Sequence, residues 1–406
     1  MQTSISEKFA NNPHIEDAES ILRSCVHCGF CTATCPTYQL LGDELDGPRG
    51  RIYLIKQVLE GNAISGRTQL HLDRCLTCRS CETTCPSGVR YGRLVEIGRE
   101  IVDQQVPRTL PQRLVRKLLR TIVPFPQRFA LIYKTGLLFR PLLPAAIKQK
   151  LPLPRSSADS SVETKARKML VLQGCVQSVV TPQTNQAASR ILQKLDIELI
   201  AAPKAGCCGA VSHHLSAPQE GLDFMRRNID AWWPYIEQGA EAIIITASGC
   251  GSVVKDYAEL LKHDSSYADK ARRVSKLAKD ISEVLRDEDL SAITSKQSTA
   301  VSVAFHSPCT LQHGQKITGV VERILENAGF RLTQVENPHL CCGSAGTYSI
   351  LQAKLSTQLL DNKLSALQQG APDVIATANI GCQMHLTSKA SIPVIHWLEL
   401  IDKSLV

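Results

Sequence analysis

The stretch CVHCGFCTATCP occupies residues 25–36, and CLTCRSCETTCP repeats its spacing at residues 75–86. Each stretch sets four cysteines in the order C-x2-C-x2-C-x3-C and closes with proline. These two stretches contain eight of the sixteen cysteines, and the other eight form a second repeat farther along the chain. Because the spacing of every cysteine recurs, the sequence predicts metal or redox sites rather than scattered thiols.

The ferredoxin-type spacing predicts two [4Fe-4S] clusters with crossed ligation. In the bacterial two-cluster arrangement, the first three cysteines of a run hold one cluster and the fourth ligates the other. One cluster is then expected on Cys25, Cys28, Cys31 and Cys85. The other is expected on Cys75, Cys78, Cys81 and Cys35. Zinc fits this pattern poorly, because zinc sites use isolated C-x2-C pairs that close with four ligands.

Residues 1–103 are expected to form a mostly helical domain around these motifs. Between them lies IYLIKQVLEG, in which Ile52, Ile55, Val58 and Leu59 mark one helical face. A gap of this length filled by a helix does not suit a compact, β-rich ferredoxin. Inside the loops, the small residues at 29 and 80, a glycine and a serine, are expected to let the backbone turn tightly around the sulfurs.

The second repeat indicates a duplicated α/β unit. The phrases QGAEAIIITASGC (residues 238–250) and QGAPDVIATANIGC (residues 369–382) align directly. In each copy, short apolar strands alternate with helical segments, which predicts a parallel sheet with helices packed against it. The predicted fold class is therefore α+β and multidomain. Its parts are the helical domain at 1–103, a basic Pro-rich connector at 104–167, and cysteine-rich α/β modules at 168–298 and 299–406.

The cysteines of the two modules fall at the carboxyl ends of predicted strands, where α/β folds place their ligands. Glycines 209 and 343 permit a sharp turn after each adjacent cysteine pair. Three interpretations stay open: an additional metal or cluster site in at least one module, a metal-free redox or acceptor site, or structural cysteines. The residues concerned are Cys175, Cys207, Cys208, Cys250, Cys309, Cys341, Cys342 and Cys382.

The formal charge of +8 is concentrated in one region of the chain. No Asp or Glu occurs from Gln104 to Ala158, whereas eleven Lys or Arg lie between Arg108 and Arg155. A solvated linker is the first interpretation of this segment, and a surface for anionic phospholipids is the second. Nucleic acid is not an expected partner, because no recognised binding module accompanies the charge.

The first residues and the hydropathy of the chain bear on its compartment. The first twenty residues, MQTSISEKFANNPHIEDAES, lack the basic and apolar regions of a signal peptide. No run of eighteen apolar residues predicts a spanning helix. We expect a reducing compartment, and hence metal or redox roles for the cysteines instead of disulfides.

The whole chain resembles the iron–sulfur subunits of bacterial glycolate oxidases (glycolate dehydrogenases). The resemblance rests on CVHCGFCTATCPTYQLLGDELDGPRGRIYLIKQVLEG, CLTCRSCETTCPSGVRY, AGCCGAV, NIDAWWP, ASGCG, CTLQH, LCCGSAGTY and TANIGCQ. Its cysteine-rich modules are also similar to those found in one of the subunits of heterodisulfide reductase. There, each module has a further cysteine and holds a non-cubane cluster, whereas Val253 and His385 occupy those places here.

No catalytic residue is assigned, because the chain lacks a G-x-G-x-x-G fingerprint, a P-loop and a G-x-S-x-G elbow. Oxidation of a hydroxy acid needs an organic two-electron cofactor. The resemblance therefore implies FAD only in partner subunits, which would oxidise glycolate and also D-lactate in a hetero-oligomer, expected to be a heterotrimer. This chain would pass the electrons to a membrane acceptor, expected to be quinone. It would attach peripherally to the cytoplasmic side of the inner membrane.

Two alternatives stay open at this point. One is the equivalent subunit of an anaerobic glycerol-3-phosphate or lactate dehydrogenase complex. The other is a non-catalytic module that uses its clusters for sensing.

Overall fold

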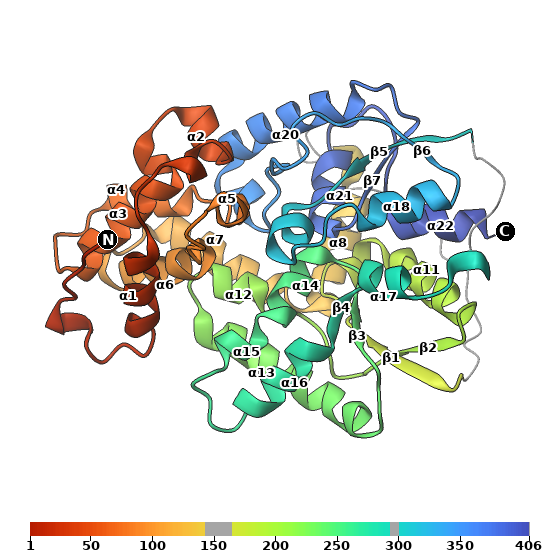
Figure 1. Ribbon diagram of the computed structural model, residues 1–406, viewed down its shortest axis with the longest axis horizontal. Coiled ribbons are helices and arrows are strands. Elements are labelled where there is room, and N and C mark those ends of the chain that lie inside the picture. Colours follow the sequence, from red (N-terminus) through yellow and green to blue (C-terminus); the bar gives the residue numbers. More distant parts are fainter. Residues whose placement is uncertain (143–164, 293–299, 406) are drawn as a thin grey trace. The chain divides into compact units, whose positions relative to one another are not determined.

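The computed structural model describes residues 1–142, 165–292 and 300–405 (Figure 1). The chain divides into two compact units. The first comprises Met1–Lys117 and His339–Leu359, and the second comprises Leu118–Pro338 and Leu360–Val406. Part of the predicted basic connector, residues 143–164, lies outside the described residues, as do residues 293–299 at the predicted junction of the two modules.

The first unit is helical where the structure describes it. Its α-helices are α1 (Ile15–Ser24), α2 (Pro36–Leu41), α3 (Pro48–Leu59), α4 (Gly66–Asp73), α5 (Ser80–Thr84), α6 (Tyr91–Gln105) and α19 (Tyr348–Leu351). Its short 3-10 turns are η1 (Glu7–Phe9), η2 (Phe30–Thr32) and η3 (Glu44–Asp46). Both α2 and α3 begin with proline, whose fixed φ suits the first helical position and whose missing N–H has no intrahelical partner to lose. Two helices, α7 (Leu110–Ile122) and α20 (Ala353–Gln368), run across the boundary between the units.

The core of the first unit lies mainly between α3 and α6. The predicted apolar face of α3 is confirmed, since Ile52, Ile55, Val58 and Leu59 are all buried. At Gly50, a Cβ atom would lie 2.1 Å from the main-chain carbonyl oxygen of Glu44. Because main chain cannot move aside as a flexible side chain can, only glycine lets α3 pack this closely on η3.

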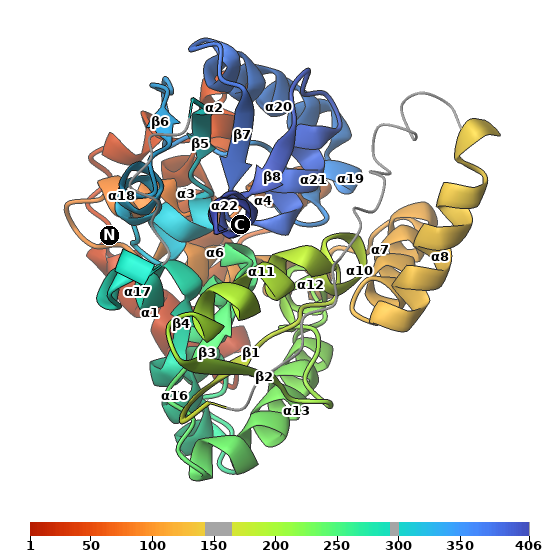
Figure 2. The same ribbon diagram turned by 90° about the vertical axis from the view of Figure 1, so that its right-hand side faces the viewer.

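Each cysteine-rich module contains a parallel sheet, as the sequence predicts, and each sheet has four strands (Figure 2). The strand orders are β2-β1-β3-β4 and β6-β5-β7-β8, so the second sheet repeats the first. In register, Leu170 of β1 pairs with Ile243 of β3, and Val303 of β5 pairs with Val374 of β7. The strands are β1 (Arg167–Val171), β2 (Ile197–Ala201), β3 (Ile243–Ile245), β4 (Ala278–Asp280), β5 (Ser302–His306), β6 (Arg331–Leu332), β7 (Val374–Thr377) and β8 (Val394–His396).

Six of these strands coincide with the apolar segments that the sequence marks. The edge strands β4 and β8 were not predicted. The strand β4 reads Ala-Lys-Asp and so lacks an apolar run, and β8 offers only Val394 and Ile395 before His396. Each becomes a strand because it pairs with the third strand of its own sheet.

The helices of the second unit cover these sheets. They are α8 (Pro126–Leu138), α10 (Gln177–Val180), α11 (Pro182–Gln193), α12 (Ala210–His214), α13 (Pro218–Glu237), α14 (Ser248–Lys255), α15 (Tyr257–Leu260), α16 (Ala268–Leu277), α17 (Ile281–Asp287), α18 (Val320–Asn327), α21 (Ile380–Thr387) and α22 (Trp397–Ser404). Short turns are η4 (Arg140–Leu142), η5 (Leu290–Ala292) and η6 (Thr310–Gly314), the last a π-helical turn. Among the residues that the structure describes, no helix is both long and apolar enough to cross a bilayer.

The two modules exchange helix contacts. The last helix of the second module, α22, packs on α11 of the first, and α17 of the first packs on α18 of the second. A single apolar core includes residues from both modules. Polar contacts fix the α11–α22 pair: the Thr184 hydroxyl donates to Glu399 at 2.9 Å, and both are buried. Arg190 adds an ion pair with Asp402. The modules therefore share one hydrophobic core.

Candidate functional site

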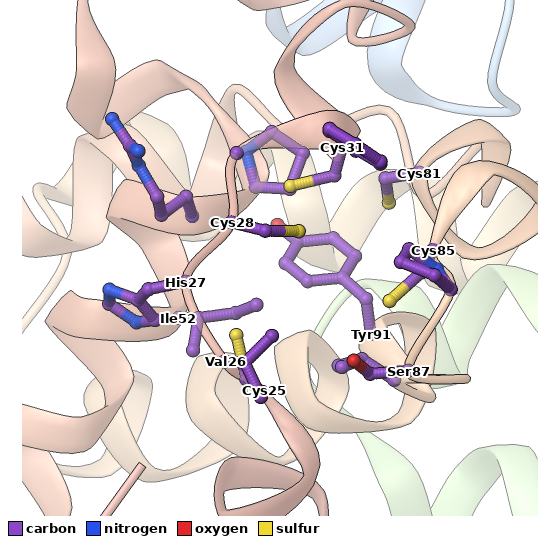
Figure 3. A pocket seen from close by; sticks show the side chains of 16 residues that line it. Cys25, Val26, His27, Cys28, Cys31, Ile52, Cys81, Cys85, Ser87 and Tyr91 are labelled. Atoms are coloured by element: carbon purple, nitrogen blue, oxygen red, sulfur yellow. The ribbon is translucent and has the colours of Figure 1, made fainter.

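One cavity brings the first three cysteines of the first motif together with the last two cysteines of the second motif. The empty space inside it, open solvent at its mouth included, is about 430 Å³. Figure 3 shows the sulfurs of Cys25, Cys28, Cys31 and Cys85 pointing into this common space. The side chain of His27, although it belongs to the same loop, points away from it. Cys85 of the second motif therefore lies with the first three cysteines of the first motif, and Cys81 lines the same space.

A second cavity brings together the remaining four cysteines of the two motifs. Its empty space, open solvent included, is about 300 Å³, and the cysteines that line it are Cys35, Cys75, Cys78 and Cys81. Cys81 also lines the first cavity, so the two spaces are neighbours within the first unit. Tyr91 lies between them and lines both, and its hydroxyl donates to the sulfur of Cys75 at 3.5 Å.

Left-handed backbone conformations give both cysteine loops their shape. In the first loop, His27 and Gly29 have φ values of 57° and 86°. In the second, the equivalent residues Thr77 and Arg79 have φ values of 53° and 61°. The expectation for Gly29 is confirmed, but the matching residue is Arg79 and not Ser80, which is buried in α5. These reversals turn three successive thiols toward one point, and the N–H of Thr77 donates to the sulfur of Cys75 at 3.4 Å.

The two cavities differ in their electrostatics. In the first, burial raises the pKa of Cys25, and burial followed by the nearby Cys25 raises the pKa of Cys31 to about 11. In the second, burial acts on Cys75 in the same direction, but the positive charges of Arg51 and Arg99 outweigh it and lower the pKa of that thiol. Negative charge is therefore better stabilised beside Cys75 than in the first cavity.

A buried ion network supports the second cavity. The carboxylate of Asp46 is completely buried and accepts from Arg51 at 3.3 Å and Arg74 at 2.8 Å, with His71 Nδ1 at 3.0 Å. The main-chain carbonyl of the same aspartate accepts from the Thr37 hydroxyl at 2.8 Å, and the Cys35 thiol lies 3.8 Å from it. Because its carboxylate oxygens are already paired, Asp46 serves as a counter-ion within the protein. Its main-chain carbonyl holds the Cys35 loop in place.

A segment of the second module lies within the first unit, close to the second cavity. The Tyr348 hydroxyl donates to the carbonyl of Arg74 at 3.1 Å, directly before Cys75 in the chain. Burial is the main cause that raises the pKa of Tyr348, and the nearby Cys75 and Cys341 thiols add to it. Cys75 of the ferredoxin-type motif and Cys341 of the module are therefore both near one tyrosine.

The first module brings its four cysteines together at the ends of three strands. Cys175 follows β1, Cys207 and Cys208 follow β2, and Cys250 lies in α14 after β3. Hydrogen bonds from the Cys175 and Cys208 thiols hold the pKa of Cys207 well below its usual range, with further help from the Gly209 N–H and Arg227.

The paired-cysteine turn has the same geometry in both copies. Gly209 and Gly343 have φ values of 92° and 88°, and their N–H groups donate to the sulfurs of Cys207 and Cys341 at 3.4 Å in each case. A Cβ atom on either glycine would lie within 2.7 Å of a main-chain carbonyl oxygen, so the turn requires glycine on two grounds. The expected role of these glycines is confirmed.

All four cysteines of the second module are buried. Cys341 and Cys342 belong to the first unit, while Cys309 and Cys382 belong to the second. Cys309 precedes η6, and Cys382 lies in α21, where the Asn379 amide donates to its sulfur at 3.4 Å. These thiols are shielded from solvent.

The donor set of the two ferredoxin-type cavities fits [4Fe-4S] clusters. Five cysteines line the first cavity and four line the second, with Cys81 common to both, and cysteine thiolates are the ligands that such clusters use. The left-handed loops hold the thiols in convergent positions. Among the residues that line either space there is no carboxylate, and the one imidazole, that of His27, points away.

Comparisons with known proteins agree with this arrangement. Residues 21–89 match a 4Fe-4S dicluster domain, which implies two [4Fe-4S] clusters, and residues 169–255 and 303–387 each match a cysteine-rich domain. The chain is 55% identical over 406 residues to the "Glycolate oxidase iron-sulfur subunit" of Escherichia coli (strain K12), covering 100% of this chain and 99% of that protein. It is 30% identical to the "Probable glycolate oxidase iron-sulfur subunit" of Bacillus subtilis (strain 168), covering 91% and 89%.

A solved structure shares the fold. A crystal structure of a hypothetical protein from Helicobacter pylori matches with a TM-score of 0.54 at 10% identity, over 98% of this chain and 75% of that one. At this identity the likeness concerns the fold alone.

Proposed function

The chain belongs to the family of glycolate oxidase iron–sulfur subunits, and from that premise we propose that it carries electrons away from partner subunits that contain FAD and oxidise glycolate. The observation that carries the proposal is that the eight motif cysteines line two neighbouring cavities, with Cys85 beside the first motif and Cys35 beside the second. Neighbouring one-electron sites suit a relay, because a flavin releases two electrons that a relay must accept singly.

The cysteines are proposed to hold the clusters in the crossed pattern. Cys25, Cys28, Cys31 and Cys85 would hold one cluster, and Cys75, Cys78, Cys81 and Cys35 the other. When bound, [4Fe-4S] clusters accept and release single electrons at potentials set by charge, hydrogen bonding and burial. The protein supplies these influences through its own side chains.

The surroundings of Cys75 favour added negative charge. Arg99 donates to the carbonyl of Cys75 at 2.6 Å and to the Thr77 hydroxyl at 2.9 Å, so its guanidinium is fixed against this loop. Arg51 is almost fully buried and donates to the carbonyl of His71 at 2.7 Å. Positive charge held in a buried site stabilises a reduced state, and we propose that the second cavity has the higher reduction potential of the two.

A third metal or redox site is proposed in the first cysteine-rich module. The support is the convergence of Cys175, Cys207, Cys208 and Cys250, with Cys207 favoured as thiolate. Thiolate is the form that binds metal. In the second module, Tyr348 lies near both Cys75 and Cys341, which favours that module as the side from which electrons leave the second cavity.

The acceptor is proposed to be a membrane quinone, with the complex attached peripherally to the cytoplasmic face of the inner membrane. The partners are FAD-containing subunits in a hetero-oligomer, proposed to be a heterotrimer. D-lactate is a second proposed substrate, since it is also a 2-hydroxy acid.

The decisive experiment purifies the native complex anaerobically, identifies its subunits, and counts flavin and iron. We expect FAD in the partner subunits only, and reduction of an artificial dye that depends on glycolate. Dye reduction with glycerol 3-phosphate, but with neither glycolate nor D-lactate, would overturn the substrate assignment. Two clusters contribute about eight irons per chain, so a firm count of eight removes an iron-containing third site.

A further inference from the structure

Exposed apolar side chains are concentrated in α7 and α8. Of the fifteen large apolar residues that are exposed in the described parts of the chain, eight lie between residues 110 and 139. On α7 they include Leu110, Leu114 and Leu118, with exposed fractions of 77%, 68% and 54%. Contiguous exposed apolar surface of this kind marks an interaction site.

The helix α7 is amphipathic. At about 100° per residue, Leu110, Leu114 and Leu118 follow one another along one face, and Val115 extends it. The charged residues of α7 are all basic, and they lie along one edge of this leucine face and behind it. They are Arg113, Arg116, Lys117 and Arg120.

Two basic residues of this helix, Arg116 and Arg120, pair with other parts of the protein, whereas the leucine side faces solvent. The Arg116 side chain is only 12% exposed and pairs with Asp73 at 3.2 Å within the first unit. Arg120 pairs with Glu220 at 3.0 Å within the second unit. An ordinary surface helix has the opposite orientation, with its apolar stripe toward the core. The orientation of α7 therefore keeps its leucines available for something outside the chain.

The length of α7 and the charge around it indicate what kind of partner would cover its leucine face. Thirteen helical residues span about 20 Å at 1.5 Å per residue, which is too short to cross a bilayer but suits a helix that lies in its surface. The sequence from Gln104 to Ala158 has no acidic residue, so nothing in that stretch repels an anionic surface. Basic residues beside exposed leucines are the combination that binds anionic lipid headgroups and the adjoining acyl region.

We propose that the leucine face of α7 inserts into the surface of a membrane that contains anionic phospholipid. This inference deepens the peripheral attachment stated under the proposed function and rests on it. Arg113, which is exposed next to the leucines, contacts headgroups, while the leucines enter the interface. The competing occupant of the leucine face is a partner subunit. In that case, replacing the leucines would release partner subunits and leave vesicle binding unchanged.

The test measures binding of the purified complex to vesicles. Sedimentation with phosphatidylcholine vesicles containing phosphatidylglycerol is compared with sedimentation with pure phosphatidylcholine. We expect tighter binding to the anionic vesicles, weakening as salt is added. Leu114→Gln combined with Leu118→Gln should weaken binding roughly 100-fold, at about 10-fold for each buried leucine. Arg113→Gln should weaken it roughly 5-fold.

The matched control is Leu70→Gln, which replaces an exposed leucine of α4 that is 40% exposed. It should bind vesicles as the unchanged complex does. Equal vesicle binding by the double leucine variant, or no binding by the unchanged complex, would overturn the inference. So would loss of the partner subunits with vesicle binding retained. Dye-linked glycolate oxidation in solution should survive the leucine changes, so its absence in the unchanged complex would count against the proposed function instead.

Discussion

Replacing Asp46 by Asn tests whether the buried ion network stabilises the second cavity. Asparagine keeps the shape of the side chain but removes the charge, and it leaves Arg51, which is 1% exposed, without its counter-ion. Removing one partner of a buried ion pair costs about 3–5 kcal/mol. With a guanidinium dependence of about 4 kcal/mol per M for a domain of this size, the unfolding midpoint should fall by roughly 1 M.

The assay is anaerobic guanidinium unfolding, followed by far-ultraviolet circular dichroism and by the visible absorbance of the clusters. Glu19→Gln is the matched control, because it breaks an exposed pair with Arg23 and should change the free energy of unfolding by less than about 0.5 kcal/mol. Adding Arg51→Met to Asp46→Asn should cost less than the sum of the two single changes, since no unpaired buried charge of that pair remains. An Asp46→Asn midpoint equal to that of the control would refute the reasoning.

Three further predictions follow from the described contacts. Cys35→Ser should abolish the cluster of the second motif and Cys85→Ser that of the first, as read by electron paramagnetic resonance; loss of each motif's own cluster contradicts crossed ligation. Burial lowers the pKa of His396 to about 4. The contribution of this histidine to the free energy of unfolding is therefore fully present above a pH of about 6.5 and is lost as the pH falls toward 4. Between about pH 7.5 and pH 5, the free energy of unfolding should fall by about 2 kcal/mol less in His396→Gln than in the unchanged protein. An equal fall in both proteins would rule out this role of His396. Gly50→Ala should destabilise the first unit by several kcal/mol in thermal melts, whereas Gly66→Ala, which meets open space, should not; equal melting temperatures would contradict the packing account.

Local sequence signals predict much of this fold. The apolar face of α3 and the apolar runs of β3 and β7 are strong because burial selects them residue by residue. Repetition predicts the duplicated modules, and cysteine spacing anticipates which thiols share a cavity. Each of these features is encoded within a short window of sequence.

The features that sequence reasoning missed depend on contacts between distant residues. Arg51 and Asp46 look like ordinary surface charges until α3 packs against η3 and buries both. The left-handed φ of Arg79 is imposed by the convergence of the thiols, and the identity of the residue gives no sign of it. The amphipathic pattern of α7 was visible, but a pattern alone does not reveal which face meets the protein.

The helix contacts between the two modules have a consequence for how the chain folds during synthesis. The buried face of α11, which includes Ala187, Ala188 and Ile191, is covered by α22 near the end of the chain. During synthesis α22 can cover this face only after residues 397–404 have left the ribosome, so the packing of the first module is completed only then. The same contacts make each module depend on the other, because removing either one would uncover apolar surface in the core that they share.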